Sequence, residues 1–222
     1  MTVRVRLPSG EVTVSAAWEK PARPSRGVVA IAHGAGAGMD HPFLVGFAAA
    51  MRAEGFTTVR FNFPYVEAGR RMPGPAAHAI LTWRAVVSSI RAEVPDAAVW
   101  VCGKSYGGRM ASMAAAEGLE VDGLVYLGYP LHPPGKPEKP RVEHLPGVRP
   151  PQLFVEGTND PFVQPLTQLE DAVKSCQDAR IAWFEGGGHS FEVKGRKRPA
   201  DEVGASAAAV VVEFISQMSP RS

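Results

Sequence analysis

The sequence has few cysteines, little net charge and no long apolar run. Only two of its 222 residues are cysteine, which excludes a fold held by several disulfides and makes a reducing cytoplasm the expected location. The formal net charge of +2 is too small for nucleic-acid binding through bulk charge. No stretch approaches the roughly 18 apolar residues that span a membrane, and the opening MTVRVRLPSG has no apolar signal-peptide core, so we expect no membrane association.

What is present is the composition of an ordinary globular protein. Hydrophobic residues make up 45% of the chain and charged residues 21%, as in most folded domains. A chain of 222 residues is long enough for one domain with a substantial core. We find no repeat and no domain-sized linker, and the seven prolines of residues 132–151 favour a loop. The sequence therefore predicts a single domain over residues 1–222.

Strand-like and helix-like segments alternate along this chain. Residues 3–18 alternate apolar and polar around a Pro-Ser-Gly turn, which predicts an antiparallel hairpin. Short apolar runs predict strands, and apolar residues at three- to four-residue spacing predict helices. The strands are expected at 27–32, 56–63, 97–103, 121–131, 152–157 and 179–186, and the helices at 43–54, 78–93, 107–118, 166–176 and 207–218. This alternation predicts an α/β fold with a mostly parallel central sheet and helices on both faces.

The stretch VWVCGKSYGGRMAS, residues 99–112, allows two interpretations. Its GKS is compatible with a phosphate-binding loop, but that motif needs a glycine five positions before Gly103, where the chain has Ala98. The pattern G-x-S-x-G matches in full, from Gly103 to Gly107. It follows a predicted strand and precedes a predicted helix, which is the context of a nucleophilic serine on a tight turn. Ser105 is therefore the candidate nucleophile.

A serine hydroxyl needs a base and an orienting acid before it can attack a carbonyl. Asp160 follows one predicted strand, in GTNDPF, and His189 follows the next, in GGGHSF. The carboxyl ends of parallel strands meet at one edge of a sheet, where ligands bind. Glu156 lies inside its strand, and His132 leads into the proline-rich segment, so both are weaker candidates. Ser105, His189 and Asp160 are the predicted catalytic residues.

An oxyanion needs two N–H donors. One is expected from the backbone of Tyr106, the residue after the nucleophile. The other is expected from the loop HGAGAGMDHP, with Ala35 as the first choice and Gly36 next. A dinucleotide-binding G-x-G-x-x-G reading of this loop fails, because its third glycine position holds Met39 or, one frame later, His41.

The chain from about residue 27 to 216 resembles the α/β-hydrolases in the order of hairpin, HGAGAG, GKSYGG, GTNDPF and GGGHSF. More narrowly, AHGAGAGMDHPF, FNFPY, CGKSYGGRMAS, LGYPLHPP and GGGHSF resemble a family of bacterial predicted hydrolases and animal Tex30-like and KANSL3-like proteins, with dienelactone hydrolases as more distant relatives. The resemblance implies an α/β-hydrolase fold. Many such hydrolases carry a lid after the strand that ends near Leu131; here only the proline-rich segment is available, so we expect little or no lid.

These observations predict a serine hydrolase that cleaves an ester or related acyl bond of a small to medium substrate through an acyl-enzyme. No metal and no organic cofactor is expected. Gly36, Asp40 and His41 are candidates for substrate binding, although Asp40 is equally suited to capping the next helix. The alternative is a non-catalytic binding or scaffold protein of the same fold, as the KANSL3-like resemblance implies. The substrate and the oligomeric state stay open.

Overall fold

The structure, a computed structural model, describes residues 1–218. Within these residues eight strands form one sheet. The strands are β1 (Thr2–Leu7), β2 (Gly10–Glu19), β3 (Val28–Ala32), β4 (Thr57–Phe61), β5 (Val99–Lys104), β6 (Gly123–Leu127), β7 (Gln152–Gly157) and β8 (Ala179–Phe184). The helices are α1 (Pro42–Ala53), α2 (Pro64–Glu67), α3 (Ala76–Glu93), α4 (Tyr106–Ala116), α5 (Leu166–Lys174) and α6 (Ala200–Met218), with a short 3-10 helix η1 (Leu145–Gly147).

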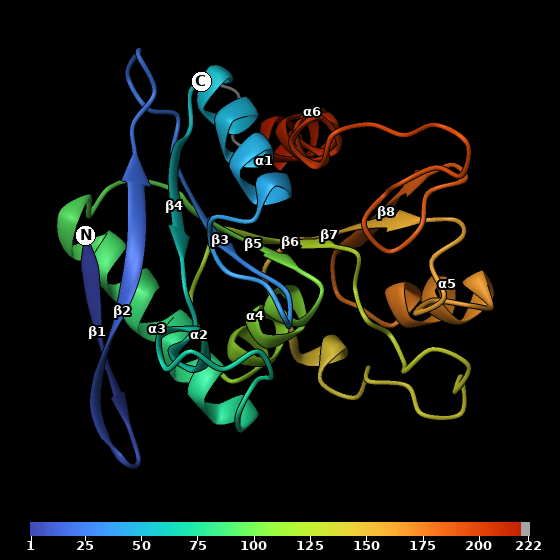
Figure 1. Cartoon of the computed structure of the whole chain (residues 1–222), viewed down its shortest axis with the longest axis horizontal. Helices are drawn as coiled ribbons and strands as arrows, with labels where there is room; N and C mark the ends of the chain where they lie inside the picture. The colour runs from blue at the N-terminus through green and yellow to red at the C-terminus, as the bar shows by residue number, and fades with distance from the viewer. Residues whose placement is uncertain (219–222) are drawn as a thin grey trace.

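The sheet is mostly parallel, as the sequence predicts (Figure 1). Its strand order is β1-β2-β4-β3-β5-β6-β7-β8. All pairs from β4–β3 to β7–β8 are parallel, whereas β1–β2 and β2–β4 are antiparallel. The predicted N-terminal hairpin therefore extends one edge of a parallel sheet. The assignment of residues 1–222 to a single domain stays a prediction.

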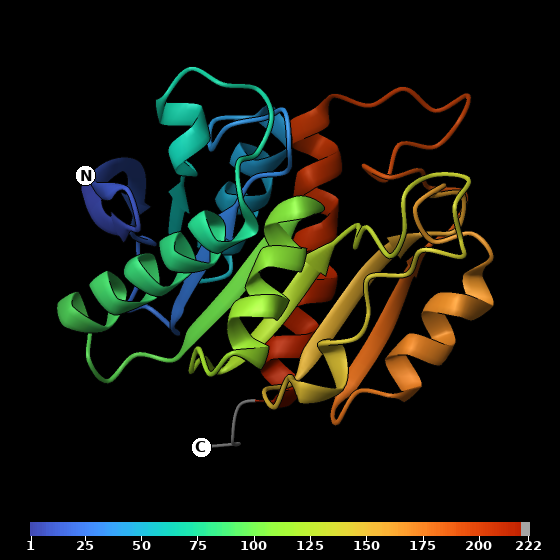
Figure 2. The same ribbon diagram turned by 90° about the horizontal axis from the view of Figure 1, so that it is seen from below.

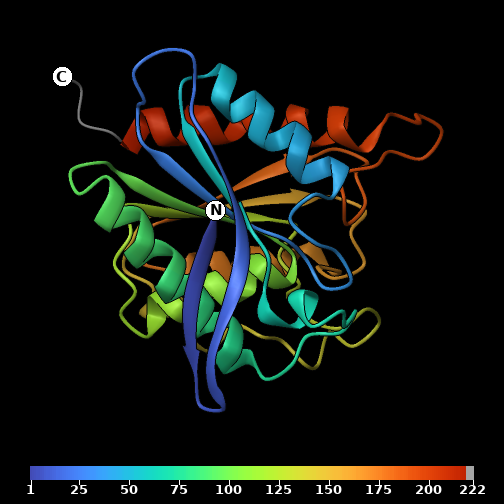
Figure 3. The ribbon, with the colours of Figure 1, turned by 60° about the vertical axis from the view of Figure 1, so that its left-hand side comes forward.

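Helices cover both faces of this sheet (Figure 3). Helices α1 and α6 pack against each other on one face, and α3 and α4 lie on the other. Successive residues of β3 alternate between the two cores: Val28 packs in the core that contains Trp83 of α3, and Val29 in the core that contains Phe47 of α1. Because side chains alternate across a strand, a strand covered on both faces must be apolar throughout. This explains the uninterrupted apolar run of β3.

The hairpin strand β1 shows the opposite pattern, because only one of its faces is covered. Val3, Val5 and Leu7 are buried in the α3 core, while Arg4 and Arg6 are exposed. The alternation of apolar and polar residues that predicts this hairpin thus results from burial of only one of its faces.

The largest differences from the prediction lie at β6, α6 and α2, and the other limits differ by a few residues at most. Strand β6 ends at Leu127, because Gly128 turns the chain out of the sheet with φ 71°; the apolar residues that follow remain buried without being a strand. Helix α6 begins at Ala200, before its apolar periodicity starts, and its first turn carries Asp201 and Glu202, which suit a helix N-terminus. The single turn α2 is not predicted; it starts at Pro64, the residue type that favours a first helical position.

The proline-rich segment 132–151 packs against the body of the protein. It contains η1, and Leu145 and Val148 are buried. His144 Nε2 lies 2.7 Å from the Ser112 hydroxyl of α4. These contacts fix the segment beside α4. None of the helices within residues 1–218 is long and apolar enough to span a membrane.

Candidate active site

Ser105 lies on a strained turn between β5 and α4. Its backbone has φ 49° and ψ −115°, a conformation that L-residues adopt rarely. The turn is tight because two backbones nearly touch: a Cβ on Gly103 would lie 2.1 Å from the Gly108 nitrogen. Glycine is therefore required there by space. The turn places Ser105 at the carboxyl edge of the sheet, after the last residue of β5. Figure 2 shows the parallel strands of this sheet running side by side.

Replacing Gly103 by alanine is expected to destabilise the protein by about 3 kcal/mol, because the added Cβ has no space and the strand and helix must separate. Gly74→Ala is the matched control, since the nearest atom to its added Cβ is a His78 nitrogen at 3.9 Å; we expect a change within about 0.5 kcal/mol. Denaturant unfolding measures both. Equal stability of the two variants would contradict the close approach.

Two further side chains form a hydrogen-bonded series with Ser105 at this edge. His189, in the loop after β8, has its Nε2 2.8 Å from Ser105 Oγ. Its Nδ1 lies 2.6 Å from Oδ2 of Asp160, in the loop after β7. The structure thus brings together the three residues that the sequence singles out, over separations of 84 and 29 residues.

The bonds around Asp160 determine which nitrogen of His189 carries the proton. The Asp160 carboxylate is fully buried, and its Oδ1 accepts from the Phe162 N–H at 2.8 Å. A carboxylate only accepts, so Nδ1 of His189 donates to Oδ2 and Nε2 is left to accept from the Ser105 hydroxyl. Burial lowers the pKa of His189, against the Asp160 hydrogen bond, which raises it, and the Lys104 charge lowers it further. The net effect is a lower pKa for His189, which favours its neutral imidazole.

Two backbone N–H groups, one directly after Ser105 and one in the loop after β3, are candidate donors to an oxyanion. Tyr106 is the first residue of α4, and within residues 1–218 its N–H has no hydrogen-bond acceptor. The N–H of Ala35, in the loop after β3, also lacks an acceptor in that part of the chain. The N–H of Gly36 instead donates to the Arg71 carbonyl at 3.1 Å. Of Ala35 and Gly36, only Ala35 thus has a backbone N–H that makes no hydrogen bond within the described residues.

His33 braces the loop that carries Ala35. It is fully buried, and its Nε2 accepts from the Phe63 N–H at 3.1 Å. Nδ1 must then carry the proton, and it donates to the Gly34 carbonyl at 2.8 Å. Burial lowers the pKa of His33 to about 4, so this neutral tautomer persists. No local sequence pattern indicates this role for His33, because only the folded chain brings Phe63 to its ring.

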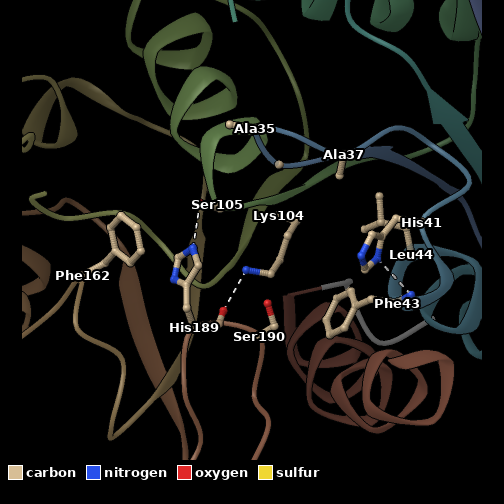
Figure 4. Close-up of a pocket in the computed structure, with 11 residues that line it drawn as sticks. Ala35, Ala37, His41, Phe43, Leu44, Lys104, Ser105, Phe162, His189 and Ser190 are labelled. Carbon is tan, nitrogen blue, oxygen red and sulfur yellow. Dashed lines mark hydrogen bonds between the residues drawn. The ribbon is translucent and has the colours of Figure 1, made fainter. Parts of the chain in front are cut away.

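A pocket of about 290 Å³ opens beside Ser105 and His189 (Figure 4). Its wall is mainly apolar, with Phe43 and Leu44 of α1 on one side and Phe162 on the other. Its other lining residues are Gly34, Ala35, Ala37, His41, Lys104 and Ser190. None of the described residues of segment 132–151 lines it, in keeping with the expectation of little or no lid.

Of the three candidates for substrate binding, the structure brings only His41 into this wall. Its Nδ1 also accepts from the Phe43 N–H at 3.3 Å and so caps α1, the role considered for Asp40. The carboxylate of Asp40 is 73% exposed and pairs with Arg60 at 2.8 Å. Neither Asp40 nor Gly36 lines the pocket.

The sequence analysis did not place Phe43, Leu44, Phe162 or Ser190 at the site. Phe162 and Ser190 had one available signal, since they lie within two residues of Asp160 and His189. In the sequence, Phe43 and Leu44 indicate only the apolar face of a helix. Two of these side chains make aromatic contacts: the Phe162 ring centroid lies 4.2 Å from that of His189, and the Phe43 ring centroid lies 5.8 Å from that of Phe191.

No group of three or more His, Cys, Asp or Glu side chains within residues 1–218 is arranged to hold a metal ion. The expectation that the protein needs neither a metal nor an organic cofactor stays a prediction.

Solved structures of similar fold come from several bacteria. An α/β serine hydrolase without a lid from Xanthomonas campestris is 22% identical, with a TM-score of 0.75, and the match covers 100% of this chain and 96% of that one. A dienelactone hydrolase from Anabaena variabilis is 20% identical, with a TM-score of 0.74 and coverage of 98% and 96%. An α/β serine hydrolase homologue from Coxiella burnetii is 19% identical, with a TM-score of 0.73 and 97% of each chain covered. At these identities the similarity shows the fold.

The family is shown by a separate comparison. A family model described as an alpha/beta hydrolase domain matches residues 25–216, nearly the span over which the motifs resemble α/β-hydrolases. The narrower resemblance to Tex30-like and KANSL3-like proteins stays a prediction. Because the match covers most of the sequence, the chain belongs to the alpha/beta hydrolase domain family.

Proposed function

We propose that the protein is a serine hydrolase that cleaves an ester or related acyl bond of a small to medium substrate. The observation that carries this proposal is the continuous hydrogen-bonded series from Ser105 through His189 to Asp160, beside an open pocket. The imidazole of His189 is 22% exposed whereas Asp160 is fully buried. The base is thus accessible to a substrate and to water, while the acid behind it is protected from both.

In the first half of the reaction, Ser105 Oγ bonds to the acyl carbon while its proton passes to His189 Nε2. The carbonyl oxygen becomes an oxyanion, and the N–H groups of Tyr106 and Ala35 donate to it. The buried Asp160 carboxylate stabilises the imidazolium that forms. The bond from the acyl carbon to the leaving oxygen then breaks, and the imidazolium returns its proton to that oxygen, leaving an acyl ester on Ser105.

In the second half, water takes the place of the departed alcohol. His189 Nε2 removes one proton from this water, and its oxygen bonds to the acyl carbon. The bond between the carbon and Ser105 Oγ breaks, and the serine recovers its proton from the imidazolium. The products are a carboxylic acid and the original enzyme.

The size and lining of the pocket support a small-molecule substrate. A volume of about 290 Å³ lies just below the range for small-molecule sites, roughly 300–1,000 Å³. Phe43, Leu44 and Phe162 favour an apolar acyl group. The substrate is therefore a small molecule, and no nucleic acid or membrane is needed for recognition. We expect this chemistry in the cytoplasm.

A fluorophosphonate probe tests for an activated serine without knowledge of the substrate. The serine oxygen bonds to phosphorus and fluoride leaves, so intact mass reports one adduct per chain. We expect wild-type protein to be labelled, and Ser105→Ala and His189→Ala to be unlabelled. Ser88→Ala, an exposed serine of α3, is the matched control and is expected to label like wild type. An unlabelled wild type, under conditions that label a known serine hydrolase, would favour the non-catalytic binding protein.

A further inference from the structure

Lys104 lies next to the nucleophile, and its side chain reaches the base. Its Nζ donates to the backbone carbonyl of His189 at 2.7 Å, across 85 residues of sequence. Figure 4 shows the Lys104 side chain extending from beside Ser105 toward His189 and Ser190. Nζ also lies 5.9 Å above the ring of Phe191. The residue before the nucleophile is thus bonded to the main chain of the residue that activates it.

The backbone of a third loop leaves room for this contact. Gly128, which directly follows β6, has φ 71°. A Cβ on Gly128 would lie 2.7 Å from the His189 carbonyl oxygen and 3.0 Å from Lys104 Nζ. Any larger residue would therefore press on both partners of the hydrogen bond. The meeting of Lys104 and His189 depends on β5, the β6 turn and the loop after β8 together.

The surroundings of Lys104 are mixed in charge. Burial lowers the pKa of Lys104 to about 8, while the nearby carboxyl groups of Glu156, Asp160 and Glu192 raise it. Burial also raises the pKa of Glu156 well above its usual value, although the Tyr129 N–H donates to this carboxyl group. Burial therefore favours the neutral form of Glu156. Lys104 is a cation at neutral pH, and within residues 1–218 no ion-pair partner lies within bonding distance of it.

The loop that carries His189 needs such an attachment. Three glycines, residues 186–188, precede His189, and glycine has the largest backbone freedom. The Asn159 N–H donates to the Gly187 carbonyl, and the Gly188 N–H to the Glu192 carbonyl, both at 2.9 Å. These bonds hold the neighbours of His189. The bond from Lys104 holds the main chain of His189 itself.

We infer that Lys104 is a positioning residue, which holds the His189 main chain so that Nε2 stays within reach of the Ser105 hydroxyl. This inference rests on the proposed hydrolase function. A displacement of about 1 Å in a catalytic group can cost about 10²-fold in rate. The ammonium also lies close enough to the imidazole to disfavour its protonation. Lys104 therefore affects both the position of the His189 imidazole and its protonation.

The test compares Lys104→Met with Lys104→Arg. Methionine fills similar space without a donor or a charge, whereas arginine keeps both. We expect Lys104→Met to lower the second-order rate of fluorophosphonate labelling about 10- to 100-fold, and Lys104→Arg to recover part of the loss. Lys197→Met is the control, since it removes an exposed cation from the loop after His189, and we expect it to label at the wild-type rate. Thermal unfolding shows that each variant is folded, and replacement of the half-buried Lys104 ammonium by methionine need not reduce stability.

The pH profile gives a readout that a purely structural role would not change. Labelling requires neutral His189, so the rate rises with pH through the pKa of this residue. The groups that act on this pKa are Lys104, which lowers it, and Asp160 and Glu192, which raise it. Removing the Lys104 cation raises the pKa, so the acid limb of the Lys104→Met profile is expected to move to higher pH. The Lys104→Arg limb is expected to stay at the wild-type position.

The outcomes separate this inference from the proposed function. If wild-type protein labels and folded Lys104→Met labels at the same rate with the same pH profile, Lys104 does not position His189. The same conclusion follows if Lys104→Met loses only affinity for anionic esters and keeps its turnover of neutral ones. If wild-type protein does not label at all, the hydrolase proposal itself fails.

Discussion

Replacing Ser105 by glycine is expected to abolish acyl hydrolysis and, at the same time, to stabilise the folded protein. Removal of the nucleophile of a serine hydrolase costs roughly 10⁴- to 10⁶-fold in kcat. The stability gain follows from the backbone, because Ser105 has φ 49°. Such a conformation costs a non-glycine residue roughly 1–3 kcal/mol, and glycine adopts it freely at an entropic cost of about 0.5–1 kcal/mol. We expect a net gain of about 1 kcal/mol.

Ser105→Ala separates the two effects. Alanine also lacks the hydroxyl but keeps the strain, so this variant is expected to be as inactive as Ser105→Gly and about 1 kcal/mol less stable than it. Hydrolysis of a short-chain nitrophenyl ester measures the activity, and urea unfolding measures the stability. Ser88→Gly is the control on an ordinary site within α3, where glycine is expected to destabilise by roughly 0.5–1 kcal/mol. If Ser105→Gly is less stable than Ser105→Ala, the backbone at residue 105 is not strained.

Asp160→Asn is expected to lower kcat/KM about 10⁴-fold with little change in overall structure. The reason lies in the second bond of Asp160. Its Oδ1 accepts from the Phe162 N–H, so an asparagine must keep its oxygen there and turn its amide toward His189. An amide N–H donates, which forces Nδ1 of His189 to accept and moves the ring proton to Nε2. A protonated Nε2 cannot take the proton of Ser105.

The measurement is kcat/KM over a range of pH, beside Asp178→Asn. Asp178 is exposed, so its variant controls for the loss of one carboxylate and is expected to keep wild-type activity. Circular dichroism and thermal unfolding check that Asp160→Asn is folded. A loss of less than about tenfold in a folded Asp160→Asn protein would show that the Asp160 carboxylate does not determine the tautomer.

Local patterns suffice where a local physical cause produces the structure. The limits of β7, Gln152–Gly157, match the prediction, because a short apolar run between turn residues describes a buried strand fully. The one-sided alternation of β1 gives the hairpin in the same way. The glycines around Ser105 indicate a tight turn, because only glycine fits where the strand and the helix nearly touch. By contrast, the buried residues after Leu127 resemble a strand and are not one, because burial alone does not require a partner strand.

The sequence by itself determined the α/β class, the order of the elements and the three residues expected to act together, because each depends on side-chain periodicity or on a turn within a few residues. Only the tertiary structure decided which atoms meet. It shows that the Gly36 N–H donates to the Arg71 carbonyl and that the Asp40 carboxylate pairs with Arg60. It also shows that Lys104 Nζ donates to the His189 carbonyl. These contacts join segments that the strand order brings side by side, and no local pattern encodes a bond between residues 20 to 85 positions apart.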